Sequence, residues 1–370
     1  MGGAGHLDPL LPLARAAAAA GHTVAIAGSG NLMPRVEAQG FTALPTSEPR
    51  PASASALDFA PLTPVVPLDT EVEFAENFAG KGARRHVPAV GEHLRTWRPD
   101  VVVREETDFG SAMAAEIAGV PCATLVILAA GTLARPDLVS PVLQAVRAEH
   151  GLAPDPTLAT FRRDLVLSPF PPSFRDPSVP LAPTAFSYRP GPVALVGRGP
   201  LVYVSLGTVF NTGAGDLFGR LLAGLAAVPA EVLVTVGHAV DPADFGSQPA
   251  HIRVERYVTQ ADVLPRCGLV VSHGGSGSLM GALEHGLPSV LTPLGADQPH
   301  NARRAADLGV ARVLDAATAT PDEIGGAVAA MLVDTGAREG ALALKAEMDA
   351  LPPAESTVPL LERLAGHYAG

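Results

Sequence analysis

The chain has 370 residues, a formal net charge of −11 and 47% hydrophobic residues, which is enough for two domains with separate cores. Its acidic balance, without any basic block, excludes nucleic acids and anionic membranes as expected partners, and no apolar run reaches the ~18 residues of a membrane span. Cys122 and Cys267 are too few for a disulfide framework or a metal cluster, and they fit a cytoplasmic location.

The first half of the chain alternates predicted strands and helices. It opens with the run Gly5-His6-Leu7-Asp8-Pro9, in which Asp8 can cap a helix and Pro9 suits the first helical turn. Residues 42–70 are rich in proline and serine and predict a long loop. The apolar patterns predict strands at 23–27, 100–104 and 120–128, and helices at 71–97, 109–118 and 140–150.

The second half restarts this pattern after a proline-rich stretch at 169–200. We expect a first domain at 1–185, a linker at 186–200, a second domain at 201–352, and a C-terminal helix at 353–370 that packs back on the first domain. Two series of alternating strands and helices predict an α/β fold with two doubly wound, Rossmann-like domains that face a cleft. The strands of the second series are predicted at 201–205, 231–236, 253–257, 269–272 and 289–291.

Two short segments of the second half follow predicted strands. Ser205-Leu206-Gly207-Thr208 is either a phosphate-facing loop or an ordinary turn. In the segment 256–260, Tyr257 either offers a flat face to a nucleobase or fills the core at a strand end.

The segment 270–301 carries the most chemical information. It contains a buried strand, a glycine-rich turn at 273–278, and then apolar residues at helical spacing. This order aims free backbone N–H groups at an anion, and Ser276 and Ser278 add hydroxyl donors. A glycine-rich turn without any ligand is the alternative interpretation.

The continuation of this segment favours a ligand. After the short strand at 289–291 come Asp297 and Gln298, and both loops are expected at the carboxyl ends of parallel strands, where ligands bind. A phosphate cradle beside a carboxylate and an amide suits a sugar nucleotide, because the cradle takes the diphosphate and the polar pair takes hydroxyl groups.

This segment resembles the donor-binding signature of the family-one glycosyltransferases of GT-B fold, especially the bacterial enzymes that glycosylate macrolide, polyketide and enediyne antibiotics. One functional position departs from the pattern, because Gly281 stands where the family commonly has a glutamate that holds ribose hydroxyls. The matching residues are His273, Gly274, Gly275, Gly277, Ser278, Ala282, Leu283, Gly286, Pro288, Pro293, Asp297, Gln298, Asn301 and Ala302.

The resemblance implies a donor site with three parts. The loop after the first strand and the glycine-rich turn hold the diphosphate, the segment 257–260 holds the nucleobase, and the polar pair orients the sugar. The implied donor-binding residues are Ser205, Gly207, Thr208, Tyr257, Val258, Gln260, His273, Gly274, Gly275, Ser276, Gly277, Ser278, Asp297 and Gln298.

The run at His6 is similar to the family's Gly-His-x-Asn-Pro motif, whose histidine is the usual catalytic base. The family's acidic partner of that histidine follows the strand predicted at 100–104, where this chain reads Arg104-Glu105-Glu106-Thr107-Asp108. The simplest alignment places Arg104 at the partner position, so we expect Glu106 to take the role, with Glu105 and Asp108 as alternatives. A solvated acidic loop is the other interpretation.

Family members begin with an apolar strand before the Gly-His loop, whereas this sequence starts inside the loop with Met1-Gly2-Gly3-Ala4. The first, central strand of the N-terminal sheet is therefore expected to be missing. Either translation begins upstream, or the protein is truncated and weakly active.

The resemblance implies an inverting, metal-independent transfer of a deoxysugar from a thymidine- or uridine-diphosphate donor to a hydroxyl of a lipophilic secondary metabolite. The nucleotide sugar is a co-substrate, no cofactor is expected, and a homodimer is compatible with the sequence. Two alternatives remain, a sugar-nucleotide epimerase of the same fold and a catalytically weak or non-catalytic homologue that binds the donor.

Overall fold

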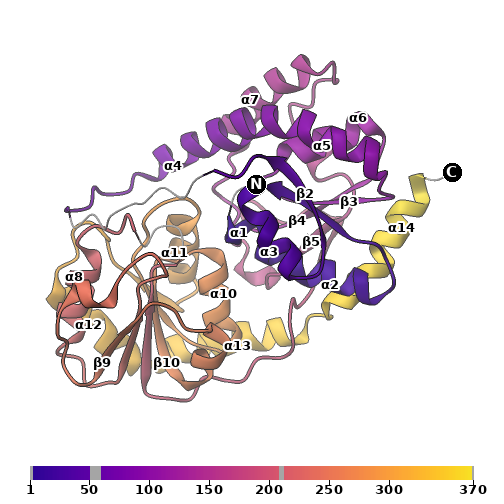
Figure 1. The fold of residues 1–370 in the computed structure, drawn as a ribbon. Coiled ribbons are helices and arrows are strands. Elements are labelled where there is room, and N and C mark those ends of the chain that lie inside the picture. The colour runs from indigo at the N-terminus through magenta and orange to yellow at the C-terminus, as the bar shows by residue number, and fades with distance from the viewer. Residues whose placement is uncertain (1–2, 51–59, 208–211, 369–370) are drawn as a thin grey trace. The chain divides into compact units, whose positions relative to one another are not determined.

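The computed structural model describes residues 3–50, 60–207 and 212–368. In it the chain folds into two compact units, whose helices and strands are drawn in Figure 1. The first unit comprises Met1–Ala52, Leu68–Pro192 and Leu351–Gly370, and the second comprises Ser53–Pro67 and Val193–Ala350. All strand pairs in both units are parallel, which confirms the predicted α/β class.

The strands of the first unit form two separate sheets. One contains β1 (Ala25–Ser29) and β2 (Thr42–Ser47). The other has the order β3-β4-β5-β6, with β3 (Val102–Glu105), β4 (Cys122–Leu125), β5 (Val166–Ser168) and β6 (Ala185–Ser187). Among the described residues β1 pairs only with β2 and β3 only with β4, so this unit has no continuous central sheet.

The helices of the first unit come from both ends of the chain. The final helix, drawn in yellow in Figure 1, belongs to this unit. The α-helices are α1 (Ala4–Leu7), α2 (Leu11–Ala19), α3 (Met33–Ala38), α4 (Pro67–Phe74), α5 (Ala83–Trp97), α6 (Phe109–Ala118), α7 (Pro136–Glu149) and α14 (Val358–Tyr368). A π-helix, η3 (Ala75–Gly82), joins α4 to α5, and short 3₁₀ turns are η1 (Asp8–Leu10), η2 (Gly30–Leu32), η4 (Ala159–Phe161), η5 (Pro172–Phe174) and η8 (Ala354–Thr357).

Local chemistry explains why α6 is found where the sequence predicts it. The Asp108 carboxylate accepts a hydrogen bond from the Ser111 N–H at 3.1 Å, which satisfies a free donor of the first turn. At the other end Gly119 adopts a left-handed conformation with φ of 67°, which stops the helix.

Two expectations for the first unit are wrong. The helical run begins at Ala4 rather than after Asp8, because Gly3 provides the N-cap and Asp8 instead bonds to Arg35 at 2.6 Å. Residues 42–47 form strand β2 rather than a loop. Pro45 lies in this strand and masks it in the sequence, but an edge strand tolerates proline because only one side needs backbone donors.

The second unit has a single parallel sheet in the order β12-β11-β10-β7-β8-β9. The order reverses between β7 and β10, so the crevice at their carboxyl ends is the usual ligand position of such a sheet. The strands are β7 (Leu201–Ser205), β8 (Val232–Thr235), β9 (Ile252–Glu255), β10 (Cys267–Ser272), β11 (Ser289–Leu291) and β12 (Ala311–Val313).

Helices alternate with these strands. In α12 a capping box between Thr320 and Glu323 fixes the first turn. The helices are α8 (Leu217–Leu225), α9 (Gln260–Val263), α10 (Ser276–Glu284), α11 (Gln298–Asp307), α12 (Pro321–Leu332) and α13 (Thr335–Ala350), with 3₁₀ turns η6 (Pro242–Phe245) and η7 (Leu264–Arg266).

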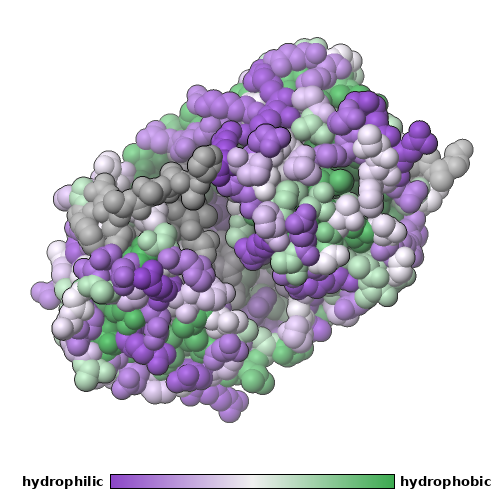
Figure 2. Space-filling model, in the orientation of Figure 1, coloured by the Kyte–Doolittle hydropathy of each residue, from purple (hydrophilic) through white to green (hydrophobic). Residues whose placement is uncertain are grey.

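Each unit has its own hydrophobic core. In the first, Phe74, Phe109 and Phe161 pack together and Leu361 brings α14 into the same cluster. In the second, α8 and α12 pack on the sheet, and Leu62 joins that core from the segment before α4. On the face shown in Figure 2, hydrophilic and hydrophobic residues are mixed. No helix in the described ranges is long and apolar enough to cross a membrane.

Candidate active site

The first group of site residues lies at the carboxyl ends of β7 and β10. Ser205 on β7 is the register partner of Ser272 on β10, so the loops that follow the two strands start side by side. Ser205 is buried and Gly207 follows it with φ of +76°, a conformation that favours glycine. Thr208, the other member predicted for this loop, lies outside the described residues.

The ring of His273 fills the space between these two loops. A side chain at Gly207 would place its Cβ 2.7 Å from His273 Cε1, and one at Gly275 would lie 2.6 Å from Nε2. Only glycine fits beside the ring on either side. His273 is buried, which lowers the pKa of the imidazole and keeps it neutral. Its Nδ1 is buried and has no hydrogen-bond partner among the described residues.

The glycine-rich turn leads directly into α10. Gly275 is its N-cap and supplies no side-chain acceptor, so the first-turn N–H groups depend on other anions or acceptors. Gly277 is exposed and Ser278 is half-buried in this first turn. The turn therefore places the backbone N–H groups of Gly277 and Ser278 and the Ser278 hydroxyl at the positive end of a helix.

Asp297 and Asn301 hold the turn in place. Asp297 Oδ2 accepts hydrogen bonds from Ser276 Oγ at 2.7 Å and from the Ser276 N–H at 3.3 Å. The Asn301 amide donates to Asp297 Oδ2 at 2.7 Å and to the Gly274 carbonyl at 3.1 Å. Asp297 is half-buried beside the start of α10, and it takes up the Ser276 hydroxyl and N–H, which the sequence pattern predicts to face an anion.

The side chain of Gln298 does not have the surroundings expected of a group that orients a sugar. It is 1% exposed, and its Oε1 accepts hydrogen bonds from the Leu294 N–H at 2.7 Å and the Gly295 N–H at 3.2 Å. Its oxygen therefore braces the turn before α11. The sequence could not show this, because the hydrogen-bond partners are backbone groups.

The segment after β9 presents an aromatic face. Tyr257 is 55% exposed and stacks on His238, with ring centroids 4.7 Å apart and an interplanar angle of 23°. A core position for Tyr257 is thereby ruled out. The sequence pattern gave no reason to select His238. Val258 packs on the small core cluster of this region, and Gln260 begins α9.

Gln260 lies next to the position that departs from the family pattern. A Cβ built on Gly281 of α10 would lie 3.5 Å from Gln260 Oε1 and 3.6 Å from Leu264 Cδ1, which are ordinary contacts. There is room for a Cβ at this position, so a clash with the first side-chain atom does not explain the glycine.

The second group of site residues lies in the first unit, where α1 meets the end of β3. His6 Nδ1 is 3.1 Å from Glu105 Oε1, and an ionised carboxylate can only accept, so Nδ1 donates and Nε2 is left as the basic nitrogen. Phe78 of the π-helix packs near the ring, with centroids 5.7 Å apart.

Glu105 is itself held in place. It is 3% exposed, its Oε2 accepts from the Thr107 N–H at 2.6 Å, and its Oε1 accepts from Thr107 Oγ1 at 2.8 Å. These bonds and the contact with His6 form the chain Thr107–Glu105–His6. This is the arrangement of a base histidine oriented by a carboxylate, in which the carboxylate also stabilises the charged ring.

The preference for Glu106 as the partner of His6 is therefore corrected. Glu106 Oε1 accepts hydrogen bonds from the Ile127 and Leu128 N–H groups at 2.6 and 2.5 Å. Its desolvation by burial raises the pKa of this carboxyl group. Asp108 is not the partner either, because it caps α6 and contacts His86 Nδ1 at 3.1 Å.

Arg104 stabilises the backbone around the end of β3. It is buried and donates to the backbone carbonyls of Glu105, Glu106 and Phe161 and to Thr124 Oγ1. These bonds fix the loop that carries Glu105. No group of three or more His, Cys, Asp or Glu side chains suited to a metal ion occurs among the described residues.

Comparison with known proteins finds a family match for each half of the chain. Residues 15–198 match the N-terminal domain of the family described as erythromycin biosynthesis protein CIII-like, and residues 219–364 match its C-terminal domain. The chain is 32% identical over 323 aligned positions to L-demethylnoviosyl transferase of Streptomyces niveus, covering 83% of this chain and 81% of that protein.

Two further similarities cover almost the full length. The chain is 29% identical to TDP-daunosamine transferase DnrS of Streptomyces peucetius, covering 98% of this chain and 95% of that protein. The crystal structure of the glycosyltransferase SnogD from Streptomyces nogalater superposes with a TM-score of 0.73 at 27% identity, covering 98% and 97% of the two chains.

Two units with parallel sheets and this structural likeness define a glycosyltransferase of the GT-B fold. The chain belongs to the EryCIII-like family of glycosyltransferases, which tailor natural products such as antibiotics.

Replacing Thr107 tests whether it positions Glu105. Thr107→Val keeps the volume and the backbone N–H but removes the hydroxyl that donates to Glu105. We expect kcat for sugar transfer to fall about ten-fold, since a hydrogen bond to a charged group contributes about 1.5 kcal/mol. Donor affinity, measured by titration calorimetry, should not change, and Thr107→Ser should restore kcat. Wild-type turnover in the valine variant would contradict the positioning role.

Proposed function

We propose that the chain transfers a deoxysugar from a thymidine-diphosphate donor to a hydroxyl group of a lipophilic polyketide-type acceptor, without a metal ion and with inversion at the anomeric carbon. The observation that carries the proposal is that the loops after β7 and β10 meet at Gly207 and His273, next to the start of α10. The name TDP-daunosamine transferase, given to a relative with 29% identity, supports the nucleotide and the sugar class.

The proposed reaction has one displacement step. His6 Nε2 takes the proton of the acceptor hydroxyl, and the oxygen attacks the anomeric carbon on the face opposite the diphosphate. The new C–O bond forms as the bond to the diphosphate oxygen breaks, and the electron pair leaves with the nucleoside diphosphate. Glu105 stabilises the imidazolium that results.

The second unit stabilises the leaving group in this proposal. Gly277 and Ser278 lie in the first turn of α10, and their N–H groups and the Ser278 hydroxyl are proposed to bind the diphosphate at the positive helix end. The buried Nδ1 of His273, for which the described residues offer no hydrogen-bond partner, adds a nitrogen that can bond to a phosphate oxygen. The exposed face of Tyr257 is proposed to stack on the base.

A transfer assay tests the proposal. The protein is incubated with a thymidine-diphosphate deoxysugar, an aromatic polyketide alcohol and excess EDTA, and products are followed by mass spectrometry and NMR. We expect a glycoside with inverted anomeric configuration. An epimerised nucleotide sugar formed without acceptor would instead indicate an epimerase. Donor binding without transfer, also after an N-terminal extension, would indicate a non-catalytic homologue.

The nucleotide preference is tested at Gly281. A Cβ at this position makes only ordinary contacts, and Gly281→Glu adds a carboxylate on α10 next to Gln260 of the 257–260 segment. We expect affinity for uridine diphosphate to rise about ten-fold relative to thymidine diphosphate, because only ribose offers a 2′-hydroxyl and a charged hydrogen bond contributes about 1.5 kcal/mol. The matched variant Gly281→Ala should leave the affinity ratio unchanged. Both affinities are measured by calorimetry. If the ratio of uridine- to thymidine-diphosphate affinity were the same in Gly281→Glu and Gly281→Ala, this placement of the ribose would be wrong.

A further inference from the structure

The first unit contains a second histidine–carboxylate pair, which the proposed reaction does not use. His86 of α5 is 2% exposed, and its Nδ1 lies 3.1 Å from Oδ1 of Asp108, the N-cap of α6. Because an ionised carboxylate can only accept, Nδ1 donates this hydrogen bond. The pair therefore ties α5 to the start of α6.

Both oxygens of the Asp108 carboxylate are occupied by donors. Oδ1 also accepts from the Ser111 N–H at 3.1 Å, and Oδ2 accepts from Ser111 Oγ at 2.6 Å. Burial acts to raise the pKa of this carboxyl group, but the contact with His86 holds the pKa well below its usual range. Asp108 is therefore ionised at neutral pH, and side chains or backbone of two helices fix its direction.

Asp108 and Glu105 are the two ends of one tight turn. The Asp108 N–H donates to the Glu105 carbonyl at 3.0 Å, and the Thr107 N–H donates to Glu105 Oε2 at 2.6 Å. A turn closed by these bonds moves as one piece, so Glu105 is held by β3 on one side and by Asp108 on the other. His86 thereby supports the contact between Glu105 and His6 from a distance.

The backbones of α5 and α6 approach closely at His86. A Cβ built on Gly110 of α6 would lie 2.5 Å from the Cβ of His86 and 2.8 Å from the Ala83 carbonyl oxygen, so only glycine allows this approach. Packing alone does not require a charged pair here, because apolar side chains of similar volume often stabilise a protein interior equally well or better. What the pair adds is a fixed direction for the Asp108 carboxylate.

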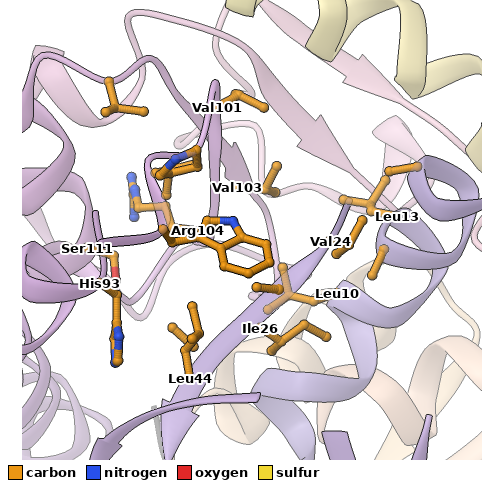
Figure 3. Close-up of a pocket in the computed structure, with 18 of the residues that line it drawn as sticks. Leu10, Leu13, Val24, Ile26, Leu44, His93, Val101, Val103, Arg104 and Ser111 are labelled. Carbon is orange, nitrogen blue, oxygen red and sulfur yellow. The ribbon is translucent and has the colours of Figure 1, made fainter. Parts of the chain in front are cut away.

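The carboxylates of both pairs line the same cavity of the first unit. His6, Glu105, Asp108 and Ser111 all lie at its wall, and the rest of the lining is mainly apolar. Figure 3 shows Ser111 among the lining residues, together with aliphatic side chains such as Val103. Charges are poorly screened in apolar surroundings, so the position of a carboxylate beside the base strongly affects how well it stabilises the imidazolium.

We propose that His86 is a positioning residue of the sugar-transfer reaction. Through Asp108 and the 105–108 turn, it holds the Glu105 carboxylate where it faces His6. This inference rests on the proposed function, in which His6 is the base, so its test includes a readout that needs no reaction.

Three variants separate the hydrogen-bond donor of His86 from its ring. His86→Phe keeps an aromatic ring but removes the donor, and His86→Asn keeps an N–H donor close to the position of Nδ1. His93→Phe is the matched control, because His93 lies on the same helix and contacts the Pro45 carbonyl of β2 at 2.9 Å instead of the turn.

We expect kcat in His86→Phe to fall about ten-fold, the usual effect of losing a hydrogen bond to a charged group. His86→Asn should stay within about three-fold of wild type because it keeps that bond, and His93→Phe within about two-fold because the site is exposed. The affinity for thymidine diphosphate, measured by calorimetry, should not change in any of them. In a Glu105→Gln background, His86→Phe should cause little further loss, because both substitutions act on the same contact.

Proton NMR provides the readout that needs no reaction. A histidine Nδ1–H that is bonded to a carboxylate resonates far downfield, so we expect one such signal from His6 and another from His86. His86→Asn should remove only the second signal, whereas His86→Phe should also shift or broaden the first.

Wild-type kcat in His86→Phe would overturn the proposal, as would an unchanged His6 signal in that variant. Equal losses in the phenylalanine and asparagine variants would also overturn it, since the donor would then not be the group that matters. Losses that multiply in the Glu105→Gln background would show that His86 does not act through Glu105. Absence of sugar transfer by the wild type would contradict the proposed function alone, and the His6 signal would then decide whether His86 positions Glu105.

Discussion

His6→Ala is expected to lower kcat/KM for sugar transfer by about 10²- to 10⁴-fold, which is the usual contribution of a general base. The ring is the basic group beside Glu105, so its removal deletes the nitrogen that is proposed to take the acceptor proton. Glu105→Gln keeps a hydrogen-bond acceptor but removes the charge that stabilises the imidazolium, so its loss should be smaller, about 10- to 100-fold.

Titration calorimetry provides the control for this result. The donor is proposed to bind the second unit, so both variants should bind thymidine diphosphate with wild-type affinity. The control variant is His22→Ala, because His22 pairs with the exposed carboxylate of Glu362 in the same unit. Turnover in this variant should stay within two-fold of wild type, since surface ion pairs contribute about 0–1 kcal/mol. Normal turnover in His6→Ala with an alcohol acceptor would show that the base assignment is wrong.

Gly207→Ala is expected to weaken donor binding by at least about ten-fold, or 1.4 kcal/mol. The added methyl group would lie 2.7 Å from His273 Cε1, so the ring or the loop must move. The positive φ of Gly207 adds backbone strain of about 1–3 kcal/mol for any other residue. Both effects act on the two loops that form the anion site.

The matched control is Gly219→Ala on α8. A Cβ at Gly219 meets no atom within 4 Å, so this variant should bind thymidine diphosphate normally and be slightly more stable. Thermal unfolding monitors the stability of both variants, and calorimetry monitors binding. Wild-type affinity in Gly207→Ala would mean that the loop after β7 does not shape the donor site.

The local chemistry of the second unit was largely predictable from sequence. The order strand, glycine-rich turn and helix is a short-range pattern, and β7, β11 and the start of α10 follow it directly. The function of Gln298 was not predictable, because its partners are the backbone N–H groups of Leu294 and Gly295. A side chain that braces its own loop looks the same in sequence as one that faces a ligand.

The choice between Glu105 and Glu106 shows a second limit. Neighbouring residues at a strand end point to opposite sides, so an uncertainty of one residue in the end of β3 exchanges their environments. Glu105 faces His6, whereas Glu106 turns to the N–H groups of Ile127 and Leu128. Strand β2 was missed for another reason, because Pro45 disguises an edge strand as a loop.

The division of roles between the units rests on donor binding at the ends of β7 and β10. Amide hydrogen exchange with and without thymidine diphosphate tests this claim most directly. We expect slower exchange in peptides covering 257–260 and 273–278, and no change in β1 or β3. Binding that protects only the first unit, or saturating nucleotide that protects neither segment, would contradict the account.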